Sequence, residues 1–210
     1  ISPSGEMIYP DRQMILFSRQ VLESNPGASV VFDVKCSQLL SDEISRLKGN
    51  PLICKTGHTF IKQKIRETSA HLGGEMSGHI FFNDRWPGFD DGIYAGARML
   101  EIIANSDDKN VFESVPNLVS TPEINIKATD DRKFQIVDQF IKNSNFENAN
   151  MIDIDGIRVE FKKGWGLLRA SNTSPFLVLR FEAETEEELA KIKEIFYLNL
   201  KEIEPATDRF

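Results

Sequence analysis

The sequence contains only two cysteines, Cys36 and Cys54, which are too few for a disulfide framework. Each lies in a run that predicts a buried element, and the favoured interpretation is a pair of reduced thiols in a cytoplasmic protein. A lysine stands beside each cysteine in the sequence, and a nearby cation can lower a thiol pKa. A nucleophilic cysteine is therefore an alternative, but the less favoured one.

Histidine is also scarce, and long apolar runs are missing. His58, His71 and His79 do not have the spacing of zinc ligands, and no cysteine pair completes such a site. No apolar run reaches the ~20 residues that a membrane-spanning helix needs. We therefore expect no metal site in this chain and no membrane partner.

An excess of basic residues is absent, since the formal net charge is −7. Nucleic acids and anionic membranes require a broad basic surface, so neither is expected as the main partner. A small anionic ligand stays possible, because it needs only a few cations and backbone N–H groups. Fifteen phenylalanines and a hydrophobic content of 40% are enough for the core of one large or two small domains.

The first part of the chain, residues 11–118, alternates helical and strand patterns. Strands are predicted at residues 29–34, 52–54 and 80–82, and helices at residues 11–24, 37–47, 59–72 and 90–105. This order is typical of an α/β domain with a mainly parallel sheet. The apolar positions of the last helix are Ile93, Ala97, Leu100 and Ile103. Asp90 and Asp91 are interpreted as a helix cap rather than a metal pair, and Phe89 and Tyr94 as core residues.

The pattern changes at residues 115–122, where two prolines interrupt both periods and predict a hinge. An alternating strand at 123–128 follows, then a helix at about 130–143 with Asp130 or Asp131 as its cap. Strands are predicted at 150–154, 157–161, 166–170 and 176–183, before a last helix capped by Thr185. Residues 119–210 therefore predict a smaller α+β domain, with an antiparallel sheet and helices on one face.

The run GEMSGH, residues 74–79, places Glu75, Ser77 and His79 two residues apart. In an extended segment, side chains at this spacing point to the same side. A carboxylate, a hydroxyl and an imidazole together suit the hydroxyl groups of a polyol. The alternative, with about equal weight from spacing alone, is an ordinary glycine-rich turn.

A second polar run, RASNTSP at residues 169–175, lies between two apolar strands. The planar guanidinium of Arg169 matches phosphate oxygens, and the turn after it offers hydroxyls and backbone N–H groups. An ordinary polar hairpin is the alternative. A third run, KTGH at residues 55–58, joins a strand to a helix, where anions often bind, and Lys35 follows the first strand at the same predicted edge.

These motifs together resemble the α-D-phosphohexomutases. GEMSGH is similar to the family's sugar-binding loop, in the methionine-containing form of the phosphomannomutase/phosphoglucomutase branch, and RASNT is similar to the phosphate-binding loop of its last domain. DVKC at 33–36, KTGH, and WPGFDDG at 86–92 are similar to parts of its third domain. The motifs occur in the family's order and span nearly the whole chain.

The resemblance implies the end of the family's second domain at residues 1–10, its third domain at 11–118 and its fourth at 119–210. It implies hexose phosphates, hexose bisphosphates and the N-terminal domains of the same protein as partners. The family's phosphoserine and its Asp-rich magnesium loop have no equivalent in the sequence. Mg²⁺ is therefore implied for the full-length enzyme and not for this chain.

The resemblance also implies roles for particular residues in reversible phosphoryl transfer. Glu75 and Ser77 would hold the sugar hydroxyls, with His79 in support; His58 could also help in proton transfer. The non-reacting phosphate would be held by Arg169, Ser171, Asn172 and Thr173, supported by Lys35 and His58. We expect the chain alone to bind substrate in part without mutase activity, and the hinge to allow the last domain to close over ligand. A stand-alone phosphosugar-binding module and a structural α/β protein with polar turns are the alternatives.

Overall fold

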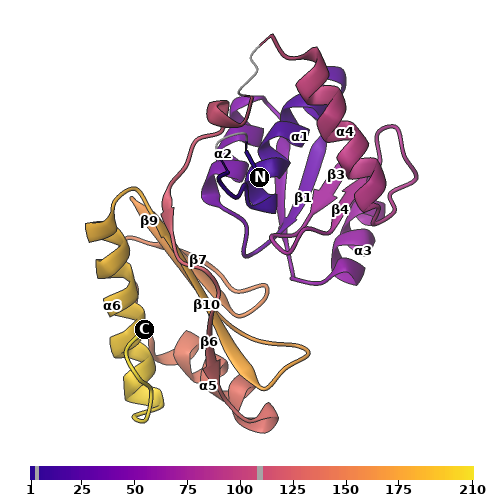
Figure 1. Ribbon diagram of the computed structural model, residues 1–210. Coiled ribbons are helices and arrows are strands. Elements are labelled where there is room, and N and C mark those ends of the chain that lie inside the picture. Colours follow the sequence, from indigo (N-terminus) through magenta and orange to yellow (C-terminus); the bar gives the residue numbers. More distant parts are fainter. Residues whose placement is uncertain (3–4, 108–110) are drawn as a thin grey trace. The chain divides into compact units, whose positions relative to one another are not determined.

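The computed structural model describes residues 1–2, 5–107 and 111–210 (Figure 1). The chain forms two compact units, Ile1–Asn117 and Leu118–Phe210. Each has its own hydrophobic core, and each is considered by itself. In the described part of the chain, no helix is long and apolar enough to cross a membrane.

The sheet of the first unit has the strand order β2-β1-β3-β4. Its strands are β1 (Ser29–Asp33), β2 (Asn50–Cys54), β3 (Leu72–Gly74) and β4 (Ile80–Phe82). β1 pairs in parallel with β2 and β3, and only β4 runs antiparallel, against β3. The prediction of a mainly parallel sheet is confirmed. The strand β3 was missed because Leu72 was assigned to the preceding helix and Gly74 to the GEMSGH run.

Helices cover both faces of this sheet. They are α1 (Pro10–Ser24), α2 (Gln38–Arg46), α3 (His58–Thr68) and α4 (Gly92–Asn105), followed by the short 3₁₀ helix η1 (Val111–Ser114). α1, α2 and α4 bury one face, with Phe17 and Phe82 in edge-to-face contact at 5.1 Å. α3 buries Ile61 and Ile65 on the other face, against Phe81. This α/β/α arrangement places the carboxyl ends of three parallel strands at one edge of the sheet.

The orientation of α4 differs from what its apolar positions led us to expect. Ile93, Leu100 and Ile103 are exposed, whereas Ala95 and Arg98 are buried. The Arg98 guanidinium lies 4.3 Å from the ring centre of Phe82 and pairs with Asp84 at 2.8 Å. The inward side of the helix therefore carries a buried charged residue together with Ala95, Met99 and Ile102. The prediction that Asp91 caps α4 is confirmed, because its carboxylate accepts from the N–H of Tyr94 at 2.9 Å.

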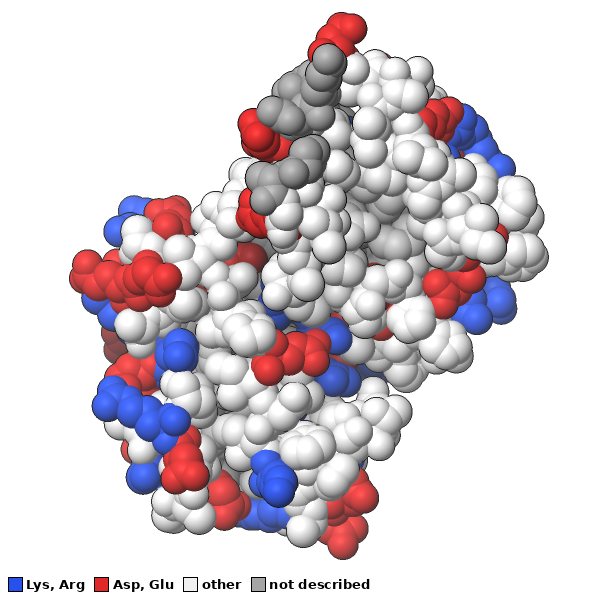
Figure 2. All heavy atoms as spheres, viewed as in Figure 1, with Lys and Arg blue, Asp and Glu red and all other residues white. Residues whose placement is uncertain are grey.

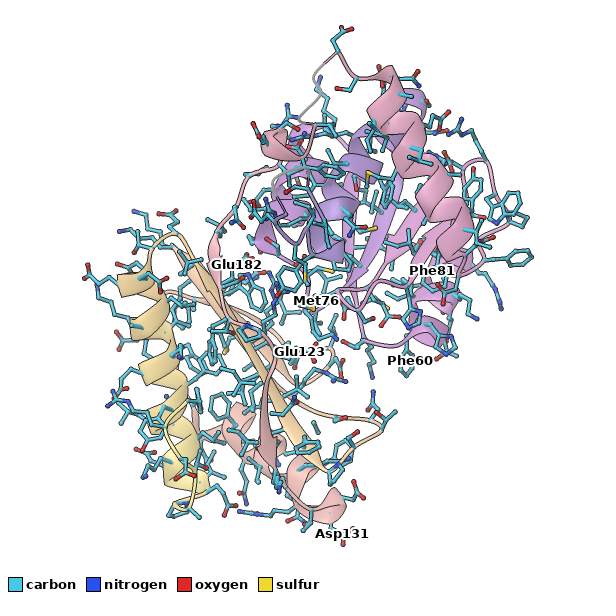
Figure 3. All side chains as sticks on the ribbon, viewed as in Figure 1. Phe60, Met76, Phe81, Glu123, Asp131 and Glu182 are labelled. Atoms are coloured by element: carbon cyan, nitrogen blue, oxygen red, sulfur yellow. The ribbon has the colours of Figure 1, made fainter. Side chains whose placement is uncertain are left out.

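The aromatic side chains of the first unit differ in their exposure. Phe89 is exposed, and the expectation that it belongs to the core is wrong. Phe60 (labelled in Figure 3), on the first turn of α3, is exposed as well, whereas Phe81 of β4 is fully buried. Tyr94 is partly buried against the core, as predicted.

The second unit is built on a fully antiparallel sheet. Its strands are β5 (Val119–Ser120), β6 (Ile124–Lys127), β7 (Asn150–Ile152), β8 (Ile157–Phe161), β9 (Gly164–Ala170) and β10 (Phe176–Ala183). The order is β5-β10-β9-β8-β7, and β6 also pairs with β10. Its helices are α5 (Asp130–Asn143) and α6 (Glu186–Ile203), which pack on one side of the sheet (Figure 1). The α+β prediction is confirmed.

Phe196 of α6 joins the helices to the sheet in this unit, with ring centres 5.4 Å from Phe140 and 5.2 Å from Phe181. Thr185 caps α6 as predicted, because its hydroxyl accepts from the N–H of Glu188 at 3.2 Å. The predicted cap of α5 is wrong by one residue. Thr129 occupies the cap position, and Asp130 lies in the first turn.

Charged side chains do not gather into one broad patch in the view of Figure 2. Basic groups occur beside acidic ones over this face of the described residues. The surface in this view agrees with the acidic net charge, which argues against a polyanion as partner.

Candidate functional site

The GEMSGH run forms a tight hairpin between β3 and β4. The N–H of Glu75 donates to the carbonyl of His79, and the N–H of Gly78 to the carbonyl of Glu75, both at 2.9 Å. Gly78 adopts φ +100°, which favours glycine. The expectation of an extended segment with three side chains on one side is therefore wrong. Glu75 is buried, while Ser77 and His79 are exposed on the loop. Residues 75–79 are called the sugar loop below.

The carboxylate of Glu75 is buried but only half satisfied. Its Oε2 accepts from the N–H of Gly57 at 2.9 Å, whereas its Oε1 is buried and has no partner among the described residues. Burial, with the nearby charge of Asp33, raises the pKa of Glu75. Most buried polar atoms in native proteins are hydrogen-bonded, so a buried acceptor without a partner marks a position for a donor from a ligand or water.

Asp33, the last residue of β1, connects the parts of this site. Its Oδ1 accepts from the N–H of Met76 (labelled in Figure 3) and from the Cys36 thiol, both at 3.1 Å. Its Oδ2 accepts from the Thr56 hydroxyl at 3.0 Å and lies 3.8 Å from Nζ of Lys35. Asp33 thus fixes the sugar loop to the carboxyl ends of β1 and β2. Sequence reasoning did not list it among the site residues, although its place at a strand's carboxyl end was the available signal.

The two predicted histidines of the first unit lie side by side. The ring centres of His58, at the start of α3, and His79 are 5.9 Å apart. Nδ1 of His79 lies 2.6 Å from a carboxylate oxygen of Asp90. Lys35 and His79 are both close enough to Glu75 to influence its titration. The structure therefore brings Lys35, His58, Glu75 and His79 to one edge of the sheet.

The RASNT run forms the turn between β9 and β10, and residues 169–173 are called the phosphate loop below. The Ser171 hydroxyl accepts from the N–H groups of Thr173 at 3.4 Å and Ser174 at 3.2 Å. The carbonyl of Ser174 also accepts from Nζ of the buried Lys133 at 3.0 Å. Ser171 therefore organises the turn from within, and Asn172 and Thr173 are exposed at its tip.

The guanidinium group of Arg169 is already bonded to a carboxylate of the same unit. It is buried, and its Nε and Nη2 donate to the two carboxylate oxygens of Asp155 at 3.0 and 3.3 Å. These two bonds use Nε and Nη2 and do not involve Nη1. Asp155 therefore orients the guanidinium and leaves one end for another anion. Asp155 was missed at the sequence level, because a lone aspartate in a turn carries no distinctive signal.

Gly156 allows this pairing. Its φ is +74°, and a Cβ there would come within 2.3 Å of the Leu168 carbonyl and 2.6 Å of Cα of Arg169. Only glycine therefore lets the turn that carries Asp155 approach β9 so closely.

Metal binding and thiol chemistry find little support. Among the described residues, no three His, Cys, Asp or Glu side chains are grouped to hold a metal ion. Burial raises the pKa of the Cys54 thiol, which disfavours the reactive thiolate.

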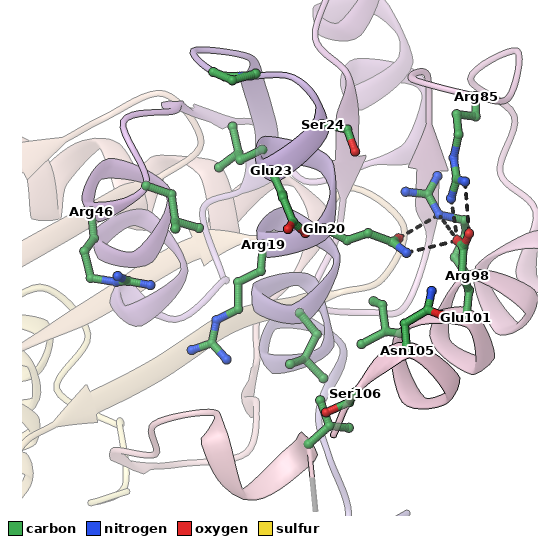
Figure 4. Close-up of a pocket in the computed structure, with 16 residues that line it drawn as sticks. Arg19, Gln20, Glu23, Ser24, Arg46, Arg85, Arg98, Glu101, Asn105 and Ser106 are labelled. Atoms are coloured by element: carbon green, nitrogen blue, oxygen red, sulfur yellow. Dashed lines mark hydrogen bonds and ion pairs between the residues drawn. The ribbon is translucent and has the colours of Figure 1, made fainter. Parts of the chain in front are cut away.

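A cavity of about 810 Å³ lies away from these loops, between α1 and α4 (Figure 4). Its four arginines are already paired: Arg98 with Asp84 at 2.8 Å, Arg85 with Glu101, and Arg19 and Arg46 with Glu43. Gln20 joins them by donating to Glu101 at 2.9 Å and accepting from Arg98 at 2.8 Å. The cationic groups in this cavity are thus neutralised within the protein.

Both units match domains of one known protein family. The model of the phosphoglucomutase/phosphomannomutase α/β/α domain III matches residues 9–121, and the model of the C-terminal domain of the same family matches residues 123–198. The chain belongs to the phosphoglucomutase/phosphomannomutase family. The resemblance found in the sequence is therefore confirmed, including the order of the two domains.

Relatives within the phosphoglucomutase/phosphomannomutase family are similar over almost the whole chain. A phosphomannomutase/phosphoglucomutase of Pseudomonas syringae pv. tomato is 51% identical over 99% of the chain and 45% of its own length. A phosphoglucomutase of Neisseria meningitidis is 50% identical over 93% of the chain and 43% of its own length. A crystal structure of a family member from Burkholderia thailandensis superposes with a TM-score of 0.92 at 46% identity, covering 98% of this chain and 44% of that one. The chain thus spans less than half the length of these relatives.

Proposed function

We propose that the chain is the substrate-recognition part of a phosphomannomutase/phosphoglucomutase. In this proposal the sugar loop binds the hydroxyl groups of a hexose phosphate, and the phosphate loop binds its non-reacting phosphate. The observation that carries it is the buried Oε1 of Glu75, which has no partner in the described part of the chain. It belongs to the same loop as Ser77 and His79, whose side chains can also bind hydroxyls.

The sugar loop offers the chemistry that a polyol needs. A sugar hydroxyl that donates to Oε1 of Glu75 would remove the cost of a buried acceptor without a partner. The exposed Ser77 and His79 can donate or accept, which suits a substrate that binds in two orientations. Lys35 and His58 would support binding near the same edge of the sheet.

The phosphate loop offers donors of the kind that an anion needs. Asp155 holds the guanidinium of Arg169, so little conformational entropy is lost when its Nη1 meets a phosphate oxygen. Asn172 and Thr173 are exposed beside it and bring further donors, while Ser171 keeps the turn in shape.

The reaction proposed for the full-length protein is reversible phosphoryl transfer between the two ends of a hexose phosphate. Such transfer depends mainly on positioning and on stabilisation of charge, and this chain's residues would supply the positioning. The phosphoserine and the Mg²⁺ are proposed to belong to the family's other domains, and the protein to act in the cytoplasm. The chain alone is then expected not to convert glucose 1-phosphate into glucose 6-phosphate, and turnover by the purified chain would contradict this.

A comparison of the affinity for mannose 1-phosphate with the affinities for mannose and for inorganic phosphate tests the proposal. Mannose 1-phosphate, mannose and inorganic phosphate are each titrated into the full chain and followed by amide NMR shifts. We expect mannose 1-phosphate to bind at least about ten-fold more tightly than either half, because both its hydroxyls and its phosphate are recognised. If inorganic phosphate binds as tightly as mannose 1-phosphate, the hydroxyl-binding role of the sugar loop is wrong.

A further inference from the structure

A second pocket of the first unit, of about 360 Å³, lies between α3 and the loop that follows β4. α3 contributes Lys62 and Arg66, and the loop contributes Asn83, Pro87 and Phe89. The volume lies within the roughly 300–1,000 Å³ that small-molecule sites occupy. None of the residues that were proposed above to bind sugar or phosphate lines this pocket, so it is separate from the candidate site.

The described residues that line this pocket include two cationic side chains and no acidic one. Lys62 is half-buried, Arg66 lies one helical turn further along α3, and neither side chain has a hydrogen-bond or ion-pair partner among the described residues. Arg66 is in the last turn, where a cation offsets the helix dipole, but Lys62 is in the middle of α3 and has no such role. In a chain with a net charge of −7, two neighbouring cations without carboxylate partners favour an anionic ligand. The larger cavity between α1 and α4 differs, because its arginines are paired within the protein.

The loop side of the pocket is apolar and aromatic. Phe89 is 60% exposed, and Pro87 is exposed beside it in the sequence. Flat rings of ligands, nucleobases included, stack on exposed aromatic side chains. Ser69, exposed directly after α3, adds a hydroxyl that can donate to an anion. The pocket thus offers cations and a donor on one side and a stacking surface on the other.

Hydrogen bonds within the unit fix the shape of this pocket. The side-chain Nδ2 of Asn83 donates to the carbonyl of Ala70 at 3.0 Å, and its backbone N–H donates to the carbonyl of His71 at 2.8 Å. Gly88 adopts φ +73°, and its N–H donates to the carbonyl of Phe82 at 2.9 Å. The loop is therefore held against the segment that follows α3, and a ligand would meet a largely preformed site, which lowers the entropic cost of binding.

We infer that this pocket binds a nucleoside phosphate, with the phosphate at Lys62 and Arg66 and the base against Phe89. Inorganic phosphate alone would leave the exposed ring of Phe89 unused. A nucleic acid would need cations along a broad surface, whereas the two cations here are confined to one small pocket of an acidic chain. The inference goes beyond the proposed function, because none of these residues takes part in it.

Titration of the 210-residue chain with adenosine 5′-monophosphate, followed by amide NMR shifts, tests this inference. We expect saturable binding with a Kd below about 1 mM, and the largest shifts in residues 62–69 and 83–89. The double variant Lys62→Gln and Arg66→Gln should bind at least about ten-fold more weakly, and glutamine keeps the helix propensity of both positions. Lys142→Gln, at an exposed position in the last turn of α5, is the matched control and should bind as the wild type does. Phe89→Ala should weaken the binding of adenosine 5′-monophosphate and leave the binding of inorganic phosphate unchanged.

Absence of saturable binding, or equal affinity of the double variant and the wild type, would overturn the inference. So would inorganic phosphate that binds as tightly as adenosine 5′-monophosphate, because the base would then contribute nothing. Arg169→Lys separates this pocket from the phosphate loop and should bind adenosine 5′-monophosphate as the wild type does. If this variant loses the nucleotide, the nucleotide occupies the phosphate loop and the inference is wrong. The proposed function is tested separately, because it concerns mannose 1-phosphate and residues outside this pocket.

Discussion

The buried carboxylate of Glu75 accepts a hydrogen bond from the backbone N–H of Gly57 at 2.9 Å, which joins the sugar loop to the start of α3. The other oxygen of the same carboxylate has no partner among the described residues. One carboxylate oxygen of Glu75 thus holds the loop in place, and the other is buried without a hydrogen bond. A buried acceptor without a partner lowers stability, and under the proposed function a ligand hydroxyl would donate to it.

Glu75→Gln should therefore make the chain more stable at neutral pH. The pKa of Glu75 is raised in the folded state, so its contribution to stability is lost as the pH rises through that pKa. The variant keeps an acceptor for Gly57 and removes the buried charge, and we expect a gain of about 1 kcal/mol at pH 7. Urea unfolding at pH 7 and at pH 4 measures it. The gain should shrink at pH 4, where both states of the wild type are largely protonated, and a less stable variant at pH 7 would contradict the prediction.

Glu43→Gln should have the opposite effect. Hydrogen bonds from Arg46 and Arg19 lower the pKa of Glu43 from 4.5 to about 2, so its stabilisation is present above pH 4.5 and is lost as the pH falls towards 2. Because Arg46 is 64% exposed, we expect a loss of about 1–2 kcal/mol at pH 7 rather than the full value of the shift. Thermal unfolding from pH 7 to pH 2 checks this, and a difference that persists unchanged at pH 2 would refute it.

Gly156→Ala should destabilise the second unit by at least about 2 kcal/mol, because the added Cβ would meet the Leu168 carbonyl at 2.3 Å in a left-handed backbone conformation. Gly96→Ala is the matched control. Its Cβ meets nothing within 4 Å, and alanine in a helix should stabilise by about 0.5–1 kcal/mol. Denaturant midpoints of the two variants should move in opposite directions, and equal shifts would show that the close approach at Gly156 is unimportant.

Arg169→Lys should weaken phosphate binding although the charge is kept. Lysine cannot pair with both oxygens of Asp155 while a further donor points at a ligand, and we expect at least about ten-fold weaker binding of mannose 1-phosphate. Arg209→Lys, at a 71% exposed position, is the control and should bind as the wild type does. If the Arg169→Lys variant binds mannose 1-phosphate with the affinity of the wild type, Arg169 does not bind the phosphate.

Much of the fold followed from local patterns in the sequence. The buried run at β1 and the alternating run at β6 predicted their strands, and Ser37 and Thr185 predicted the starts of α2 and α6. The inward side of α4 could not be predicted, because apolar residues occur on both sides of the helix, with Ile93 and Leu100 on one and Met99 and Ile102 on the other. The pairing of Arg98 with Asp84, which allows a charged residue to be buried, is not visible in the local pattern.

The candidate site was predictable in its residue types and less so in its geometry. Spacing placed Glu75, Ser77 and His79 on one extended face, but the hairpin turn separates the buried Glu75 from the exposed pair. Asp33 and Asp155 were missed, because their partners lie far away in the sequence. Met76 is 43 residues from Asp33, and Arg169 is 14 residues from Asp155.

The central claim is that the sugar loop recognises hydroxyl groups and the phosphate loop recognises phosphate. The most direct test is an NMR titration of the wild type, Glu75→Gln and Arg169→Lys with mannose 1-phosphate and with inorganic phosphate. Glu75→Gln should weaken the binding of mannose 1-phosphate at least about ten-fold and leave the binding of inorganic phosphate unchanged. Arg169→Lys should weaken the binding of both ligands. Absence of saturable binding to the wild type, or equal binding of mannose 1-phosphate by all three proteins, would contradict the claim.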